Sequence, residues 1–252
     1  MLTAENIVRR AGGLNGISLD VKAACVTTVI GANGAGKSTL LDVLSGRKSA
    51  DSGSVVFAGR PIDAWRPQEL ARKRGYLPQA SDVAFDIKVD DLVALGRAPY
   101  GEYVADGAIE AALRLTQANH LRGRFYHRLS GGERQRVQLA RVIAQVWRPG
   151  PSLDERLLFL DEPTASLDPG HRLSVMRVLR ELAGSGIGVL LALHDLNDAV
   201  RFADHVLLLH RGRLLADGPP ADVLKPRLLE EAYAAEVDMT TASDGAPVIL
   251  FR

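Results

Sequence analysis

A phosphate-binding pattern near the N-terminus constrains the fold of this chain more than any other feature. Residues 31–39 read GANGAGKST and match the spacing G-x-x-x-x-G-K-[ST]. The apolar, β-branched run 26–30 before them is typical of a buried strand, and residues 39–44 are expected to form a helix. A strand, a glycine-rich turn and a helix in this order form a phosphate site, so a chance match is disfavoured.

Each part of this pattern has an expected task. The glycines allow backbone N–H groups to surround phosphate oxygens, and the helix N-terminus adds partial positive charge. Lys37 is expected to reach the β- and γ-phosphates, and the Ser38 hydroxyl is expected to bind Mg²⁺. The residues predicted to contact ATP are Gly31, Asn33, Gly34, Ala35, Gly36, Lys37, Ser38 and Thr39.

The composition is that of an ordinary globular protein, with 46% apolar and 24% charged residues among 252. A net charge of +1 gives no strong field toward nucleic acid or anionic lipid. Cys25 is the single cysteine, which excludes an internal disulfide; a small core residue is favoured there over a reactive thiol. No secretion signal is visible, and the apolar runs 189–193 and 206–209 are too short to cross a bilayer. We therefore expect a cytosolic protein, or one that reaches a membrane through a partner.

Hydrophobic periodicity predicts an α/β core interrupted by a helical lobe. Residues 2–21 and 55–58 indicate short antiparallel strands, and residues 67–74 a helix. Helical periodicity then dominates between about 81 and 154, for example in residues 89–95. We interpret this region as a helical subdomain inserted into the core.

The core resumes with the continuous apolar run 157–160, which suits a central parallel strand. The elements expected after it are a helix at 172–183, a strand at 188–193, a helix at 197–203, a strand at 206–209 and a hairpin around 211–212. Such alternation implies a parallel sheet covered on both faces. We predict one α/β domain over residues 1–252, its core formed by about 1–80 and 155–252, with a short, mixed tail from 219.

Two adjacent acids close the strand at 157–160. A carboxylate at the C-terminal end of a parallel strand faces the ligand crevice. Asp161 is therefore expected to hold Mg²⁺, and Glu162 to act as the general base that polarises the attacking water. A solvated strand end is the alternative, and the phosphate loop upstream disfavours it.

A second glycine-containing motif lies in the helical region, at residues 129–135 (LSGGERQ). Ser130 and Glu133 have the spacing of a capping box, which would begin a helix whatever the function. Gly131 and Gly132 weaken a helix, but they open its backbone N-terminus to an anion.

Taken in order along the chain, these motifs resemble those of ATP-binding-cassette (ABC) ATPases over nearly the whole sequence. Gln79 matches the glutamine loop, Asp168 the loop that crosses to the partner, and His194 the switch histidine. The resemblance implies a P-loop NTPase core with a parallel sheet, an N-terminal antiparallel β subdomain and an inserted helical subdomain. It also implies two copies packed head to tail, each covering the other's ATP.

The resemblance assigns further roles. His194 would contact the γ-phosphate and orient Glu162, and Gln79 would join Ser38 and Asp161 around the metal. The residues expected to contact nucleotide outside the phosphate loop are Gln79, Ser130, Gly131, Gly132, Glu133 and Asp168. Of these, Ser130 to Glu133 would act on the ATP held by the other copy.

Residues 59–62, 92–100 and 193–197 resemble the importer branch that serves haem, iron–siderophore and cobalamin permeases. Residues 137–147 and the extra segment 148–156 are similar to the haem members in particular. The resemblance implies a peripheral subunit on the cytoplasmic face of the bacterial inner membrane, bound to a permease dimer and acting indirectly with a periplasmic substrate-binding protein. A siderophore or cobalamin importer is the first alternative and an exporter the second; a soluble cassette on nucleic acid is disfavoured, because no heptad run is present.

The sequence leaves two contacts open, the one with adenine and the one with the permease. The end of the first strand lacks the aromatic residue that relatives place on adenine; Arg9 or Arg10 could stack there, or could be solvated. Phe85, Tyr100 and Tyr103 are candidate permease contacts, the alternative being packing within the helical subdomain.

Overall fold

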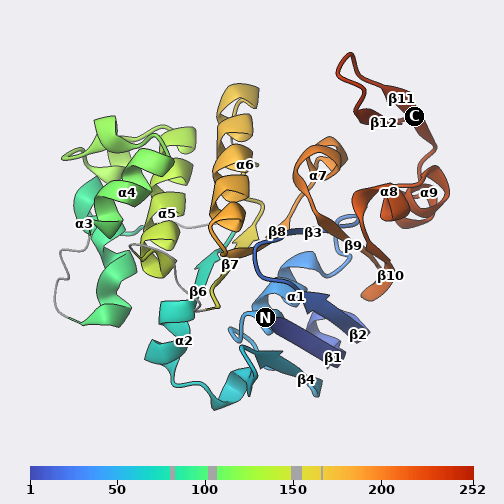
Figure 1. Ribbon diagram of the computed structural model, residues 1–252, viewed down its shortest axis with the longest axis horizontal. Helices are drawn as coiled ribbons and strands as arrows, with labels where there is room; N and C mark the ends of the chain where they lie inside the picture. Colours follow the sequence, from blue (N-terminus) through green and yellow to red (C-terminus); the bar gives the residue numbers. More distant parts are fainter. Residues whose placement is uncertain (80–82, 102–106, 149–154, 166) are drawn as a thin grey trace.

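The computed structural model describes residues 1–79, 83–101, 107–148, 155–165 and 167–252 (Figure 1). A six-stranded sheet runs through its centre, in the order β10-β9-β3-β8-β7-β6. Its strands are β3 (Val26–Ile30), β6 (Arg74–Leu77), β7 (Leu157–Asp161), β8 (Gly188–Ala192), β9 (His205–His210) and β10 (Arg213–Gly218). All neighbours in it are parallel except β9 and β10. The predicted parallel sheet is confirmed.

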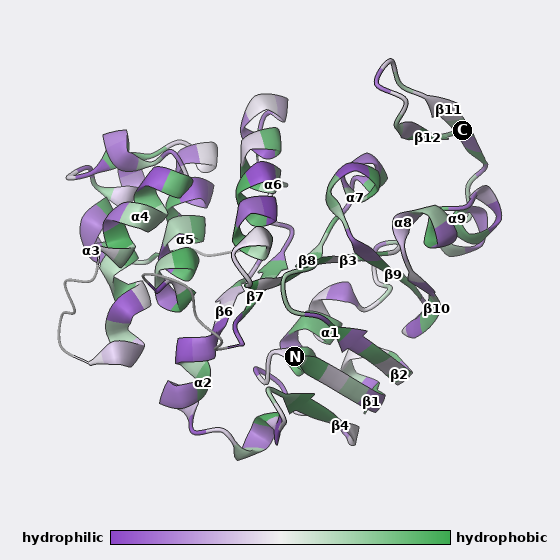
Figure 2. Cartoon of the chain, in the orientation of Figure 1, coloured by the Kyte–Doolittle hydropathy of each residue, from purple (hydrophilic) through white to green (hydrophobic). Residues whose placement is uncertain are grey.

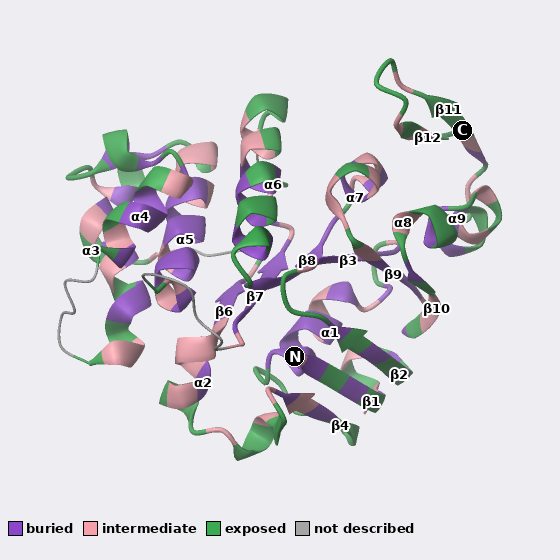
Figure 3. Cartoon of the chain, viewed as in Figure 1, coloured by how far each residue is buried: buried purple, intermediate pink, exposed green. Residues whose placement is uncertain are grey.

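The predicted N-terminal antiparallel strands form a second sheet, in the order β2-β1-β4-β5. Its strands are β1 (Leu2–Arg9), β2 (Leu14–Val21), β4 (Ser52–Phe57) and β5 (Arg60–Pro61). Buried and exposed residues alternate along β1 and β2, as expected for strands with one face on a core (Figure 3).

The central sheet separates two apolar cores because neighbouring residues of a strand point to opposite faces. Leu157 and Phe159 of β7 pack on the side of the antiparallel sheet and of α1 (Lys37–Leu44). Leu158 and Leu160 pack on the other side, with the helices that cover that face. These include α5 (Gly131–Val146), α6 (Pro169–Gly184), α7 (Leu196–Phe202), α8 (Pro220–Val223) and α9 (Pro226–Tyr233). Strand β8 and most of β7 are accordingly apolar (Figure 2).

The helical subdomain consists of α3 (Val89–Ala94), α4 (Ala108–Leu115) and α5 (Gly131–Val146), with α2 (Pro67–Lys73) between it and the antiparallel sheet (Figure 1). The 3₁₀ segment Leu95–Tyr100 packs closely on α5, where a Cβ at Gly96 would lie 2.2 Å from the Arg141 carbonyl oxygen. The Tyr100 hydroxyl lies within hydrogen-bonding distance of the carbonyl oxygens of Gln145 (3.0 Å) and Arg72 (3.2 Å), so its contacts are made within this region. Phe85 is 62% exposed, and Tyr103 lies outside the described residues.

Two parts of the fold were not predicted. Strand β6 follows α2 without a break, where the sequence analysis continued the helix through Arg74. The tail, for which no elements were predicted from residue 219 on, forms α8, α9 and a hairpin of β11 (Val237–Thr241) and β12 (Pro247–Phe251), which contacts α9 and α7. Across the described part of the chain, no helix combines the length and apolar character needed to span a bilayer.

Candidate nucleotide site

The phosphate loop connects the C-terminal end of β3 to the first turn of α1. Gly34 and Gly36 have φ angles of 78° and 103°, which lie in the left-handed region that favours glycine. The Lys37 ammonium bends back over the loop and donates to the carbonyl oxygens of Gly31 (2.7 Å) and Ala32 (3.3 Å). Burial lowers the pKa of Lys37, and the charges of Glu162 and Asp161 oppose that shift.

A pocket of about 480 Å³ lies over this loop. It is lined by Gly12, Asn33, Gly34, Gly36, Lys37, Ser38, Thr39, Gln79, Glu162 and His194. The fold therefore brings Gln79, Glu162 and His194 to the phosphate loop, although they follow three different strands. This meeting results from the strand order, because β6, β7, β8 and β3 are parallel and end at the same edge.

Glu162 contacts both Gln79 and His194 directly. The Gln79 side-chain amide donates to Glu162 Oε2 at 2.7 Å, and Glu162 Oε1 forms a short contact with His194 Nε2. Glu162 has a φ of 53°, an uncommon value for a residue with a side chain and one that recurs at functional sites. Glu162 is thus held between an amide and an imidazole beside the phosphate loop.

Asp161 lies deeper than Glu162, at the last position of β7, and is 4% exposed. Burial raises the pKa of its carboxyl group, the Ser38 hydroxyl lowers it through a hydrogen bond, and the charge of Glu162 raises it further. Asp161 Oδ1 is buried and has no hydrogen-bond partner among the described residues. A buried carboxylate oxygen with unused lone pairs beside a hydroxyl suits a hard cation such as Mg²⁺. In the described part of the chain no cluster of three acidic, histidine or cysteine ligands exists.

The capping-box prediction is confirmed at the start of α5. Ser130 accepts from the Glu133 N–H, and the Glu133 side chain accepts from the Ser130 N–H at 2.8 Å, which holds the pKa of Glu133 below its usual range. Ser130 and Gly131 are exposed, and a Cβ at Gly131 would meet nothing within 4 Å. None of residues 130–133 lines the pocket over the phosphate loop of the same chain.

The start of α5 is nevertheless tied to the loop after β7. The Gln135 side chain donates to the Pro163 carbonyl at 3.0 Å, and a Cβ at Gly132 would lie 3.4 Å from Leu167. Asp168 caps α6 and pairs with His171, which holds the pKa of Asp168 below its usual range. Asp168 does not line the pocket either, and Ser166, which belongs to the same loop expected to cross to the partner, lies outside the described residues.

Gly12 is a pocket residue that the sequence analysis did not predict; a Cβ there would lie 2.2 Å from Thr39 Cγ2. The sequence feature that could have indicated it is the Gly12-Gly13 pair, which brings the loop after β1 against α1.

Arg9 bonds to the Ser49 carbonyl, and the Arg10 N–H donates to Asp51 at 2.7 Å. Neither arginine lines the pocket, so stacking on adenine stays a prediction.

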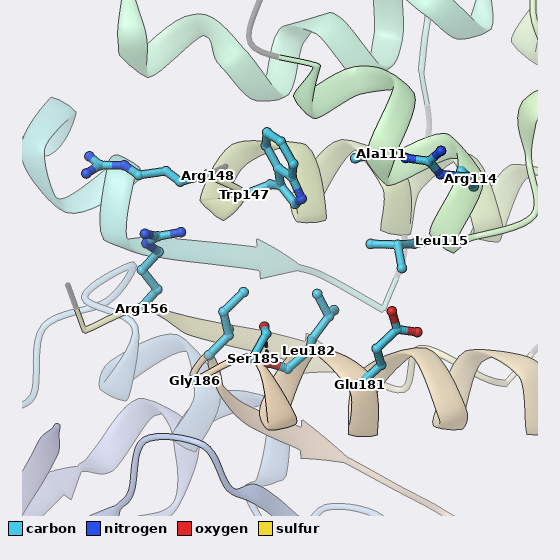
Figure 4. A pocket seen from close by; sticks show the side chains of 11 residues that line it. Ala111, Arg114, Leu115, Trp147, Arg148, Arg156, Glu181, Leu182, Ser185 and Gly186 are labelled. Atoms are coloured by element: carbon cyan, nitrogen blue, oxygen red, sulfur yellow. Dashed lines mark hydrogen bonds between the residues drawn. The ribbon is translucent and has the colours of Figure 1, made fainter. Parts of the chain in front are cut away.

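A separate pocket of about 430 Å³ lies between the helical subdomain and the core (Figure 4). Trp147 and Arg148 approach it from the end of α5, and Arg156, Glu181 and Gly186 from the core. None of its described lining residues is a predicted site residue. The candidate site is therefore the pocket at the phosphate loop.

The fold and the pocket over the phosphate loop together define an ABC-type ATPase. A family model supports this assignment. The family model described as "ABC transporter" matches residues 14–165. The chain belongs to the ABC transporter family.

Two similar proteins are both described as hemin import ATP-binding proteins. The chain is 43% identical to the hemin import ATP-binding protein HmuV of Pseudomonas fluorescens (strain Pf0-1), with 100% of both chains covered. It is 41% identical to HmuV of Rhizobium meliloti (strain 1021), over 96% of this chain and 94% of that protein.

Solved structures show the same fold. The ADP conformation of MJ1267, an ATP-binding cassette of an ABC transporter, matches with a TM-score of 0.78 and 27% identity, over 94% of this chain and 99% of that one. A chain described as a metal-chelate type ABC transporter in an inward-facing conformation matches with a TM-score of 0.83 and 25% identity, covering 100% and 96%.

Proposed function

We propose that this chain is the ATP-hydrolysing subunit of a bacterial importer for haemin. The observation that carries the proposal is the contact of Glu162 with both Gln79 and His194 at the rim of the phosphate-loop pocket. The cargo is proposed from the relatives, whose names state hemin import and whose matches cover at least 94% of each chain. A subunit without the cargo's binding site carries this information only by association.

In this proposal ATP lies along the phosphate loop, with Lys37 exchanging the Gly31 and Ala32 carbonyls for phosphate oxygens. Gly31, Asn33, Gly34, Ala35, Gly36 and Thr39 frame the phosphates. Ser38, Asp161 and Gln79 would hold Mg²⁺, which supplies charge neutralisation at the phosphates when it is bound. Glu162 accepts a proton from the attacking water, and His194 keeps Glu162 oriented.

The second half of each site comes from another copy of the chain. Ser130 and Gly131 are exposed, and their helix N-terminus offers N–H groups and partial positive charge to an anion. A head-to-tail pair would place residues 130–133 and Asp168 of one copy over the ATP of the other. Closure of the pair on ATP and its reopening after hydrolysis would drive the permease.

The proposed location is the cytoplasmic face of the inner membrane, reached through a permease dimer that receives haemin from a periplasmic binding protein. Phe85 supports this docking, because a large aromatic side chain that is 62% exposed suits the core of an interface. Tyr100 is used internally, so Phe85 is the better candidate of the two.

The composite site predicts complementation between two inactive variants. In Gly131→Asp, the new carboxylate has open space and favours the helix N-terminus, but it repels the partner's ATP. We expect its ATPase rate with the permease to fall at least about tenfold, whereas Gly131→Ala stays within about threefold. Mixing Gly131→Asp with Glu162→Gln chains should restore turnover above that of either alone, because each mixed dimer contains one complete site. A mixture no faster than the average of its parents would refute the shared site.

The cargo is tested with the chain reconstituted with its membrane subunits in vesicles. Haemin should stimulate ATP hydrolysis and accumulate inside, whereas cobalamin and a ferric siderophore should do neither. Transport of one of those cargos instead would place the chain in that importer. ATP hydrolysis coupled to outward movement only would reject import.

A further inference from the structure

The C-terminal tail, for which the sequence indicated no role, contacts the phosphate loop through Tyr233. Tyr233 ends α9, and its hydroxyl oxygen accepts a hydrogen bond from the Gly31 N–H at 2.9 Å. Gly31 is the first residue of the phosphate loop. Burial raises the pKa of Tyr233 to about 12, so the hydroxyl stays neutral under ordinary assay conditions.

Gly31 is fixed on several sides. Its φ is 147°, and a Cβ there would lie 2.3 Å from the Leu209 carbonyl oxygen of β9. Its own carbonyl accepts from the Lys37 ammonium at 2.7 Å. One residue therefore connects Tyr233, through its N–H, to the lysine that is proposed to bind phosphate, through its carbonyl.

The same tail also holds the segment that follows His194. Asn197 lies three residues further on, in α7, where its own N–H donates to Asp195 at 2.8 Å. The Asn197 side chain bonds twice to Ile249 of β12: it accepts from the Ile249 N–H at 2.8 Å and donates to the Ile249 carbonyl at 3.2 Å. A side-chain amide that pairs with both backbone groups of one residue fixes the strand's position on the helix.

Strand β12 joins these two contacts. Phe251 follows Ile249 by two residues, so both side chains are on the same face of the strand. The ring of Phe251 lies 5.3 Å from the ring of Tyr233, in a tilted arrangement that aromatic pairs favour. A short strand thus contacts both the tyrosine that holds Gly31 and the asparagine next to the His194 loop.

We propose that β12 and Tyr233 form a brace that positions the phosphate loop and the His194 loop relative to each other. The inference rests on the proposed function, in that the phosphate loop binds ATP, and it makes Tyr233 and Asn197 positioning residues. A tail that only covered apolar surface would need no hydrogen bond from Tyr233 to a phosphate-loop N–H. It would also need no pair of hydrogen bonds between the backbone of Ile249 and the side chain of Asn197. The Gly31 N–H is where the brace acts, because a buried N–H that loses its partner must be re-satisfied by movement of the loop.

The test measures MgADP affinity, the KM for ATP and kcat for Tyr233→Phe, Asn197→Ala and the double variant. Tyr233→Phe keeps the ring and removes only the hydroxyl; the dissociation constant and KM should rise about fivefold to tenfold, with kcat within about twofold. Asn197→Ala should lower kcat about threefold to tenfold and raise the dissociation constant about threefold. In the double variant the effects on affinity should not multiply, because each substitution releases the same brace.

Tyr126→Phe is the matched control, since Tyr126 is also buried and its hydroxyl accepts from Gln138 at 3.1 Å, within the helical subdomain. It should lower the melting temperature as much as Tyr233→Phe does, without changing MgADP affinity. Unchanged affinity in Tyr233→Phe, in a wild-type chain that binds MgADP, would overturn the positioning role. Effects that multiply in the double variant would overturn the brace. Failure of the wild type to bind nucleotide would instead reject the proposed function.

Discussion

Glu162→Gln is expected to lower kcat for ATP hydrolysis about 10³-fold while ATP still binds. The amide has the shape of the carboxylate and can keep an oxygen toward the Gln79 amide, so the contact of 2.7 Å survives the change. What is lost is the ability to accept a proton from water. Because binding and hydrolysis separate, ATP should accumulate on the protein and hold two copies together.

The measurements are phosphate release for kcat, and size-exclusion chromatography with ATP for the trapped dimer. Glu181→Gln is the matched control, since it makes the same change of charge on α6, outside the phosphate-loop pocket, and should keep the wild-type rate. Phosphate release at the normal rate from Glu162→Gln would show that another group is the base.

Lys37→Ala is expected to weaken ATP binding about 100-fold, because two charge-assisted hydrogen bonds to phosphate oxygens are lost. Lys37 is 6% exposed, and burial lowers its pKa, so its ammonium interacts with little screening by water. The two carbonyl oxygens of the loop also lose their donor, which adds a small cost in stability.

Nucleotide titration checks the affinity, and thermal melting checks the fold. Lys48→Ala removes an equal charge from an ion pair with Asp42 at 2.6 Å, outside the pocket, and should bind ATP normally. Wild-type affinity in Lys37→Ala would remove the phosphate loop from the proposed site.

Four of the residues singled out from the sequence line the phosphate-loop pocket together, because they lie beyond the ends of parallel strands. Lys37, Gln79, Glu162 and His194 each follow an apolar run, and parallel strands end at one edge of their sheet. Residues 130–133 were also predicted as a helix start, since a capping box acts within four residues.

Local patterns predicted secondary structure less well where the conformation of a segment depends on distant neighbours. Strand β6 has four residues, among them Gly75, where a Cβ would lie 2.7 Å from Leu158 and from Val142. It is a strand because β7 pairs with it, not because its own residues favour that state.

The sequence by itself determined the phosphate loop, the acid pair, the helix start at residues 130–133 and the alternation that gives a parallel sheet. These features are local, with a spacing of a few residues that fixes both the backbone and its chemistry. Only the tertiary structure decided that Glu162 accepts a hydrogen bond from Gln79, and that Tyr233 holds Gly31 across 202 positions of sequence. Such contacts depend on strand order and on how a tail packs, and no periodicity in the chain records which distant residue will satisfy a buried N–H.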